Sequence, residues 1–219
     1  MDDSKFVEQL MQEVYSEQTD KNEKLSYISA QSGGLLPEPV VKHCLNFAVY
    51  YERSAVSFIG GWLKDTHETT ALSNFANQIR DEAKHYRWLA KFMPDYGMMP
   101  EAFTPPDAWK FLMEEYYPSL ETSIERLAAH NIAAECGALG FMEFHLDRFP
   151  PKLRDYVNRI IRDEHYHVTF GKNLLAKYCK TDGEQELARR AIRESMQHMR
   201  NARESFVSAP SMLTTEGVN

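Results

Sequence analysis

Cysteine is scarce in this 219-residue chain, and Cys44, Cys136 and Cys179 form no Cys-x-x-Cys pair. Their number and spacing argue against a disulfide framework and against a rubredoxin-type iron site, and favour buried or half-buried thiols in a reducing compartment. The chain also lacks a run of about 18 apolar residues, so no transmembrane helix is expected. Because the acidic N-terminus lacks the basic start and apolar stretch of a signal peptide, we expect a cytoplasmic protein.

The sequence also has no excess of basic residues. The sequence has 25 Lys and Arg against 32 Asp and Glu, which gives a formal net charge of −7 at pH 7. A nucleic-acid surface needs clustered Lys and Arg, so we expect no nucleic-acid partner. Hydrophobic residues make up 43% of the chain, and its length fits a single domain, residues 1–219, with a sizeable core.

The alternating β-branched pattern of strands is nearly absent, whereas long segments carry a helical period. We therefore predict an all-α fold, a four-helix core over about 39–180 with additional N- and C-terminal helices. The helices expected span about 3–17, 39–64, 66–93, 107–148, 151–180 and 183–206. Asp65 and Glu68 are expected to form a capping box at the start of the helix that ends near 93. Asp107 is expected to cap the third core helix, and Pro118 to kink or break it.

One short pattern occurs twice in the sequence. Residues 79–85 and residues 161–167 both read Ile-Arg-Asp-Glu-x-x-His, which is improbable by chance. Residues three apart lie on one face of a helix, so Glu82 with His85, and Glu164 with His167, can each reach one metal ion.

Both pairs lie within apolar stripes, and a carboxylate buried alone is costly. The stripe around Glu82 and the stripe around Glu164 contain, respectively, Phe75, Ile79, Leu89 and Met93, and Leu153, Val157, Ile160, Ile161, Val168 and Leu175. Two buried Glu and His pairs therefore predict a shared cation.

Each pair needs a partner helix that supplies another carboxylate. Antiparallel helices joined by a tight turn bring together residues equidistant from that turn. Glu52 is as far before the turn at residue 67 as Glu82 is after it. Glu135 and Glu164 are likewise nearly equidistant from the turn at residue 150. Glu143 is the alternative, but it lies about 12 Å further along its helix.

The predicted ligands are thus four carboxylates and two neutral imidazoles: Glu52, Glu82, His85, Glu135, Glu164 and His167. Four negative charges balance two divalent ions, and mixed oxygen and nitrogen ligands suit iron or manganese. Zinc usually closes a site of four ligands, so a six-ligand, two-centre arrangement disfavours it.

This ligand plan resembles the ferritin-like di-iron carboxylate superfamily, in which two helices each supply Glu and two others each supply Glu-x-x-His. The resemblance covers roughly residues 40–180. Within it, the segment Ile-Arg-Asp-Glu-His-Tyr-His-Val-Thr-Phe-Gly at 161–171 is most similar to the fourth helix of aldehyde-deformylating oxygenases. Arylamine N-oxygenases add a histidine where this chain has Ile160, which lowers that alternative.

The resemblance also implies roles for the aspartates that precede the two ligand glutamates. Asp81 would accept the free ring N–H of His167, and Asp163 that of His85, which orients each imidazole. The other interpretation is a surface aspartate paired with a neighbouring arginine, Arg80 or Arg162.

Other polar residues are interpreted as structural. His165 points away from His167 and is expected at the surface. Tyr50, Tyr51, Tyr86 and Tyr166 are expected to pack with their hydroxyls bonded, with a redox role as the alternative. His43, His130, His145 and His198 have no matching carboxylate in the sequence pattern.

Two functions follow from this resemblance. The first is a di-iron oxygenase or oxidase that uses O₂ on a small, partly apolar organic molecule, with electrons from a donor such as a ferredoxin and its reductase. The second is iron handling, as a ferroxidase or peroxidase-like protein of the bacterioferritin or rubrerythrin type. A cage-sized assembly favours the second, whereas a monomer or homodimer favours the first. A metal-free bundle would leave both acidic clusters unexplained.

Overall fold

The computed structural model describes residues 5–17 and 34–207, and every regular element in these parts is helical. The all-α prediction is therefore confirmed for the described residues. A helix over residues 5–17 comes first. The further elements are α2 (Glu38–Trp62), η1 (Leu63–Asp65), α3 (Thr69–Ala90), η2 (Met93–Tyr96), η3 (Pro100–Ala102), α4 (Asp107–Lys110), η4 (Phe111–Tyr116), α5 (Tyr117–Ser119), α6 (Ser123–Arg126), η5 (Leu127–Ala134), α7 (Glu135–His145), η6 (Leu146–Arg148), α8 (Pro151–Tyr178) and α9 (Asp182–Val207).

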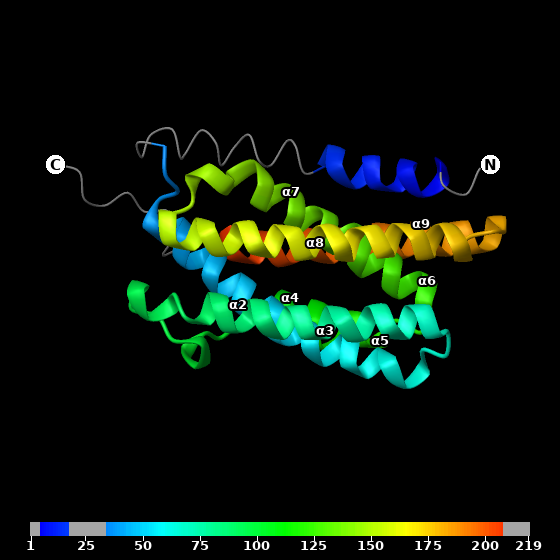
Figure 1. Cartoon of the computed structure of the whole chain (residues 1–219), viewed down its shortest axis with the longest axis horizontal. Helices are drawn as coiled ribbons and strands as arrows, with labels where there is room; N and C mark the ends of the chain where they lie inside the picture. Colours follow the sequence, from blue (N-terminus) through cyan, green and yellow to red (C-terminus); the bar gives the residue numbers. More distant parts are fainter. Residues whose placement is uncertain (1–4, 18–33, 208–219) are drawn as a thin grey trace.

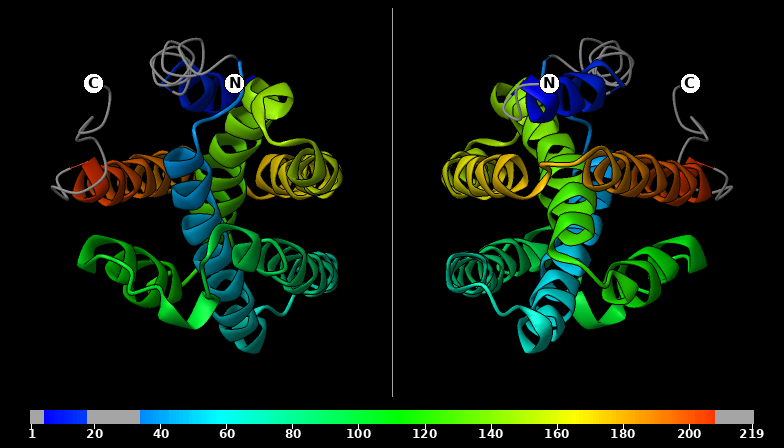
Figure 2. Two further views of the ribbon diagram at one scale, coloured as in Figure 1. Left: turned by 90° about the vertical axis from the view of Figure 1, so that its left-hand side faces the viewer. Right: turned by 90° about the vertical axis from the view of Figure 1, so that its right-hand side faces the viewer.

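The long helices run lengthwise through the molecule (Figure 1). Viewed along that direction, α2 and the helix of α6 to α7 occupy the middle, α3 and α8 lie on one side, and α9 with α4 and α5 lie on the other (Figure 2). Helix α2 packs against α3, α3 against α8, and α8 against η5 and α7. These four neighbours thus surround a common interior. None of the described helices is both long and apolar enough to cross a membrane.

A continuous apolar core joins the early and late parts of the chain. Buried side chains extend from Phe6 in the first helix to Ala202 in α9. The first helix is also tied down by polar contacts, since Lys172 Nζ lies 3.0 Å from Glu8 Oε1 and Arg200 lies 2.8 Å from Glu17 Oε2. The terminal helices therefore cover the core as expected. The irregular stretch after residue 17 and the tail after Pro210 lie outside the described residues.

Two predicted helix starts are wrong. The capping box of Asp65 and Glu68 does not form, because Asp65 belongs to the short η1 turn and Glu68 itself caps α3 by accepting a 2.7 Å bond from Ala71 N. Asp107 is not the N-cap of the third helix, because it is already the first residue of α4 and Pro106 occupies the N-cap position. In both cases the helix begins at another residue than the one expected, so another residue stands beside its free N–H groups.

The third predicted helix is interrupted near Pro118, as expected. Regular structure ends at Ser119, Leu120 is extended, and Thr122 starts the next helix with a capping box to Glu125. A feature absent from the prediction is that η4 and η5 are π-helical segments. A π turn bonds residue i to i+5 and is frequent at functional sites. Segment η5 leads directly into α7 and therefore changes the direction in which its side chains point.

Gly171 marks a close approach of α8 to η5. A β-carbon at this position would lie 2.5 Å from the Asn131 β-carbon, which is next to the backbone and cannot move freely. We expect Gly171→Ala to lower the free energy of unfolding by about 1–3 kcal/mol, the usual effect of overpacking. Urea denaturation measures this change. Gly60→Ala is the matched control, since its β-carbon meets no atom within 4 Å and should stabilise the helix by roughly 0.5–1 kcal/mol. Equal stability of the two variants would contradict this expectation.

Candidate metal centre

The six predicted ligands lie on four neighbouring helices and meet in the interior. Helix α2 carries one, α3 two, the start of α7 one and α8 two, and none of the six is more than 6% exposed. The amphipathic stripes explain this placement, because each ligand lies among apolar residues that the helix must bury. The residues are Glu52, Glu82, His85, Glu135, Glu164 and His167.

His85 directs its Nδ1 atom at three carboxylates. This nitrogen lies 3.2 Å from Glu164 Oε1, 3.3 Å from Glu82 Oε2 and 3.5 Å from Glu52 Oε2. One ring nitrogen carries at most one hydrogen and cannot satisfy three acceptors. These four side chains form one of the two groups whose ligand atoms all lie within 4.8 Å of one another.

His167 forms the second group in the same way. Its Nδ1 atom lies 2.9 Å from Glu164 Oε2 and 3.5 Å from Glu82 Oε1. Glu135 completes this group, whose ligand atoms again all lie within 4.8 Å of one another. Glu135 thus belongs only to the group of His167, just as Glu52 belongs only to the group of His85.

Glu82 and Glu164 belong to both groups, and each divides its two oxygens between them. Glu82 turns Oε2 toward His85 and Oε1 toward His167, and Glu164 turns Oε1 toward His85 and Oε2 toward His167. Two adjacent groups that share two carboxylates could hold a pair of divalent cations.

Unpartnered buried atoms fit that description. Glu52 Oε2, both Glu82 oxygens and His85 Nδ1 are buried without a hydrogen-bond partner among the described residues. Ligand atoms about 2.1 Å from one ion and at right angles to each other lie about 3.0 Å apart. The distances around His85 Nδ1 and His167 Nδ1 range from 2.9 to 3.5 Å, so the residues present suit divalent ions.

Burial raises the pKa of all four of these carboxyl groups, but neighbouring groups outweigh it at Glu82 and Glu164. It raises the pKa of Glu52 and Glu135 well above the usual value. His85 opposes this rise at Glu52 while Glu82 adds to it, and Glu164 and Glu82 both raise the pKa of Glu135 further. At Glu164 the charge of His167, together with hydrogen bonds to Glu135, His167 and His85, holds the pKa well below the usual value. Four carboxylates in one dry volume therefore require positive charge nearby.

The pKa of each of the two histidines is raised, although burial by itself lowers it. Burial lowers the pKa of His167, yet Glu164 and Glu82 raise it to about 10. Burial likewise lowers the pKa of His85, and Glu52 with the other carboxylates raises it far above the ordinary value. The imidazoles supply the positive charge that balances the carboxylates, and a pair of divalent cations would supply it instead.

The outer nitrogen of each histidine faces an aspartate of the opposite helix. His85 Nε2 lies 3.0 Å from Asp163 Oδ2, within hydrogen-bond length, and His167 Nε2 lies 3.6 Å from Asp81 Oδ2, an ion-pair distance. Arg80 also approaches Asp81, at 3.4 Å. Both interpretations of Asp81 thus have a contact in the structure, whereas Asp163 faces the histidine.

Lys84 links the two aspartates and was not among the predicted site residues. Its Nζ atom lies 2.9 Å from Asp81 Oδ1 and 2.7 Å from Asp163 Oδ2, and it sits 5.2 Å from the centre of the Trp88 ring. The spacing of Asp81 and Lys84 on one helix face was visible in the sequence, but Asp163 comes from another helix. Lys84 therefore completes a chain of contacts from one imidazole to the other.

We expect Lys84→Met to weaken metal binding about tenfold, because loss of an outer partner of a metal ligand typically costs this much or more. Methionine keeps an apolar stem over Trp88 but removes the charge that holds both aspartates. Anaerobic calorimetric titration with Fe(II) measures the change. Lys91→Met, at an exposed position, is the control. Affinity unchanged in Lys84→Met would show that the lysine contributes no more than a surface charge.

Glu135 has further polar neighbours, and one of them corrects a prediction. His130, interpreted from sequence as lacking a matching carboxylate, places Nε2 3.0 Å from Glu135 Oε1. Tyr51 donates to the same oxygen at 3.1 Å, and Gln78 Nε2 donates to it at 3.2 Å. In an α-helix, residues five apart point about 140° away from each other. The π turn of η5 removes that separation, which is why the sequence pattern hid this pair.

Residues set aside from the site lie elsewhere. Glu143 is exposed and pairs with the exposed His165 at 2.9 Å, so it is not brought to the ligands. Tyr50 donates to Glu114 and Tyr166 to Asn74, in agreement with packing and a bonded hydroxyl.

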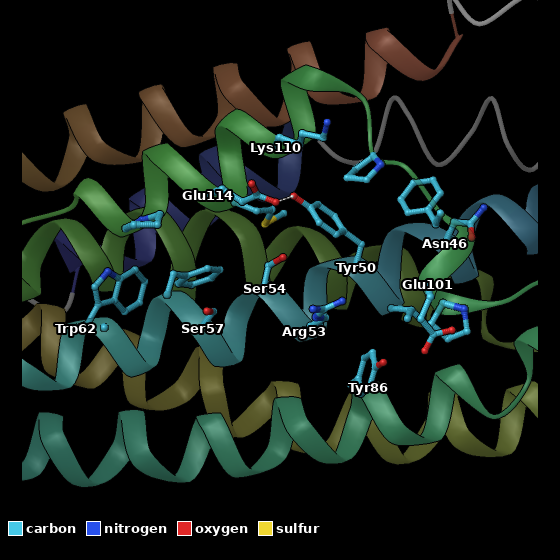
Figure 3. Close-up of a pocket in the computed structure, with 18 of the residues that line it drawn as sticks. Asn46, Tyr50, Arg53, Ser54, Ser57, Trp62, Tyr86, Glu101, Lys110 and Glu114 are labelled. Carbon is cyan, nitrogen blue, oxygen red and sulfur yellow. Dashed lines mark hydrogen bonds between the residues drawn. The ribbon is translucent and has the colours of Figure 1, made fainter.

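A groove of about 700 Å³ runs along the outer face of α2, between it and the segment from η3 to α5 (Figure 3). None of the six predicted ligands lines it. Arg53, which follows Glu52, and Val49, three residues before Glu52, line the groove, and Tyr86, which follows His85, lines its α3 side. The groove and the buried centre are thus separated by the thickness of α2.

No model of a known protein family matches this chain, and no curated protein is similar enough in sequence to count as a relative. The functional interpretation therefore depends on the geometry of the site.

Proposed function

We propose that this chain is a non-haem di-iron oxygenase or oxidase with a ferritin-like bundle, which uses O₂ to act on a small, partly apolar organic molecule. The observation that carries the proposal is the division of Glu82 and Glu164, each of which gives one oxygen to the His85 side and one to the His167 side. This pattern matches the ligand plan of di-iron carboxylate proteins.

The residues that would hold the two ions are Glu52 and His85 at one position, Glu135 and His167 at the other, and Glu82 and Glu164 between them. Carboxylate and imidazole donors suit iron or manganese. Two reduced iron ions bound there would supply the binding and reduction of O₂. The chain's own residues fix the ligand geometry, and the surrounding core excludes bulk water.

A small organic substrate is supported by the groove along α2. Its volume of about 700 Å³ falls within the range of roughly 300–1,000 Å³ that is usual for small-molecule sites. Phe58, Met113 and Phe103 line it together with Ser54 and Ser57, so apolar and hydrogen-bonding surfaces alternate. If the reaction consumes electrons, a donor such as a ferredoxin with its reductase is required.

The test is anaerobic reconstitution with Fe(II), followed by measurement of metal per chain and of O₂ uptake with and without candidate substrates. The expected result is two iron ions per chain and O₂ uptake that rises when a partly apolar aldehyde, acid or amine is added. Zero or one ion per chain would reject the dinuclear centre. Rapid iron oxidation that no organic compound affects, in a cage-sized assembly, would favour iron handling instead.

A further inference from the structure

The two metal positions have unequal support from the protein. Glu135 Oε1 has three polar neighbours, Tyr51, Gln78 and His130, at 3.0 to 3.2 Å. At the other position, Glu52 Oε2 has no hydrogen-bond partner among the described residues, and His85 Nδ1 is 3.5 Å away. One oxygen of Glu135 is therefore surrounded by groups that are not ligands, whereas Oε2 of Glu52 has no such support among the described residues.

The hydrogen atoms around Glu135 follow from the geometry. Tyr51 has one hydroxyl hydrogen, which it donates to Glu135 Oε1, so its oxygen presents a lone pair to His130 Nε2 at 2.7 Å. Two lone pairs would repel at that distance, so Nε2 of His130 carries a hydrogen. The other ring nitrogen of His130, Nδ1, is buried without a hydrogen-bond partner among the described residues.

Asn131 fixes the orientation of the third neighbour, Gln78. Asn131 Nδ2 donates to Gln78 Oε1 at 3.0 Å, which turns the Gln78 amide nitrogen toward Glu135. Glu135 Oε1 thus accepts from two donors, Tyr51 and Gln78, while His130 lies 3.0 Å away and holds the Tyr51 hydroxyl. Since these donors occupy one oxygen, the second oxygen is the one left for an ion.

Aromatic packing keeps His130 in this orientation. Its ring is stacked on Tyr51 with centroids 5.9 Å apart and 12° between the planes, and Phe58, Trp62 and Tyr117 surround it at 5.1 to 5.8 Å. The ring cannot turn without displacing these side chains, because the interior is close-packed. The support of Glu135 is therefore rigid.

We propose that Tyr51, Gln78 and His130 are positioning residues that restrict Glu135 to binding through one oxygen. The position of Glu135 and His167 is then the tighter one, filled first. The position of Glu52 and His85 is looser, and Glu52 moves aside there to admit an exogenous ligand. This inference rests on the dinuclear centre of the proposed function, but not on O₂ chemistry.

The location of the groove agrees with this assignment. Arg53, next to Glu52, and Tyr86, next to His85, both line the groove, and both face the gap between α2 and α3 in Figure 3. Both ligands of the looser position thus have sequence neighbours at the groove wall.

The experiment is a titration of the full chain with Co(II), followed by visible absorption, which reports how each ion is coordinated. In the natural sequence we expect two steps, with dissociation constants at least tenfold apart. Tyr51→Phe and His130→Leu should each weaken the tighter step about 10–100-fold, the usual effect of losing an outer partner, and change the weaker step less than threefold. His130→Gln, whose amide can place N–H near the lost Nε2, should restore most of the affinity.

Tyr50→Phe is the matched control, because the Tyr50 hydroxyl bonds to Glu114 in the groove rather than to a ligand. It should leave both steps unchanged. Azide serves as the exogenous probe and should alter the spectrum only after the second ion is bound. Two equal steps, an equal effect of Tyr51→Phe on both steps, or an azide response from the singly loaded protein would each overturn the proposal. A chain that binds two Co(II) ions unequally but, loaded with iron, consumes no O₂ rejects the proposed function and retains this inference.

Discussion

Glu82→Ala and Glu164→Ala are each expected to abolish binding of both metal ions, whereas Glu52→Ala should leave one ion per chain. The reason is that Glu82 and Glu164 each divide their oxygens between the two histidines. Removal of either takes one ligand from both positions and leaves the remaining carboxylates repelling one another. Glu52 contributes to one position only.

Metal content after anaerobic loading with Fe(II) and desalting measures this difference, and far-ultraviolet circular dichroism checks that each variant keeps its helices. Glu143→Ala is the control, since Glu143 is also a glutamate of α7 but pairs at the surface with His165. It should retain two ions. Retention of two ions by Glu82→Ala, in a folded chain, would remove the bridged arrangement.

Metal loading should raise the melting temperature by roughly 15–30 °C. An ion present at about a thousand times its dissociation constant stabilises the folded state by about 4 kcal/mol, so two ions contribute about 8 kcal/mol. For a chain of this size, 1 kcal/mol shifts the midpoint by roughly 2–4 °C. The large effect is expected because the ions neutralise four buried carboxylates that otherwise depend on protonated histidines.

Differential scanning calorimetry of chelator-treated and Fe(II)-loaded protein, both without O₂, gives the shift directly. Mg²⁺ at the same concentration should produce a much smaller shift, because it prefers oxygen ligands and retains its water. Glu164→Ala provides the internal control and should show no metal-dependent shift. An equal response of this variant and the natural sequence would mean that the ions bind elsewhere.

The helices and the six meeting side chains could be anticipated from local patterns. Glu and His three residues apart share a helix face whatever the fold, and the apolar stripe around Glu82 requires that face to be buried. Equal distances from a short turn then brought Glu52 to the level of Glu82. These inferences succeeded because they use only helical geometry and short connections.

Other features could not be anticipated in this way. Lys84 was visible as a neighbour of Asp81, but its second partner, Asp163, lies on another helix. The start of α3 was misplaced because Asp65 and Glu68 both offer capping oxygens, and the adjoining η1 turn decides which one meets the free N–H groups. Competition between equally suitable local groups is resolved by the surrounding structure.

The repeated Ile-Arg-Asp-Glu-x-x-His pattern is sufficient to indicate two buried carboxylate and imidazole pairs, because side-chain direction along a helix follows from its period. The unequal support of the two positions depends instead on packing. Tyr51 and Glu135 are 84 positions apart in the chain and Gln78 and Glu135 are 57 apart, while His130 reaches Glu135 through a π turn that no local pattern announced. The contacts of Tyr51 and Gln78 exist only once separate helices have packed around a common interior, since their distances are set by tertiary geometry rather than by spacing along the sequence.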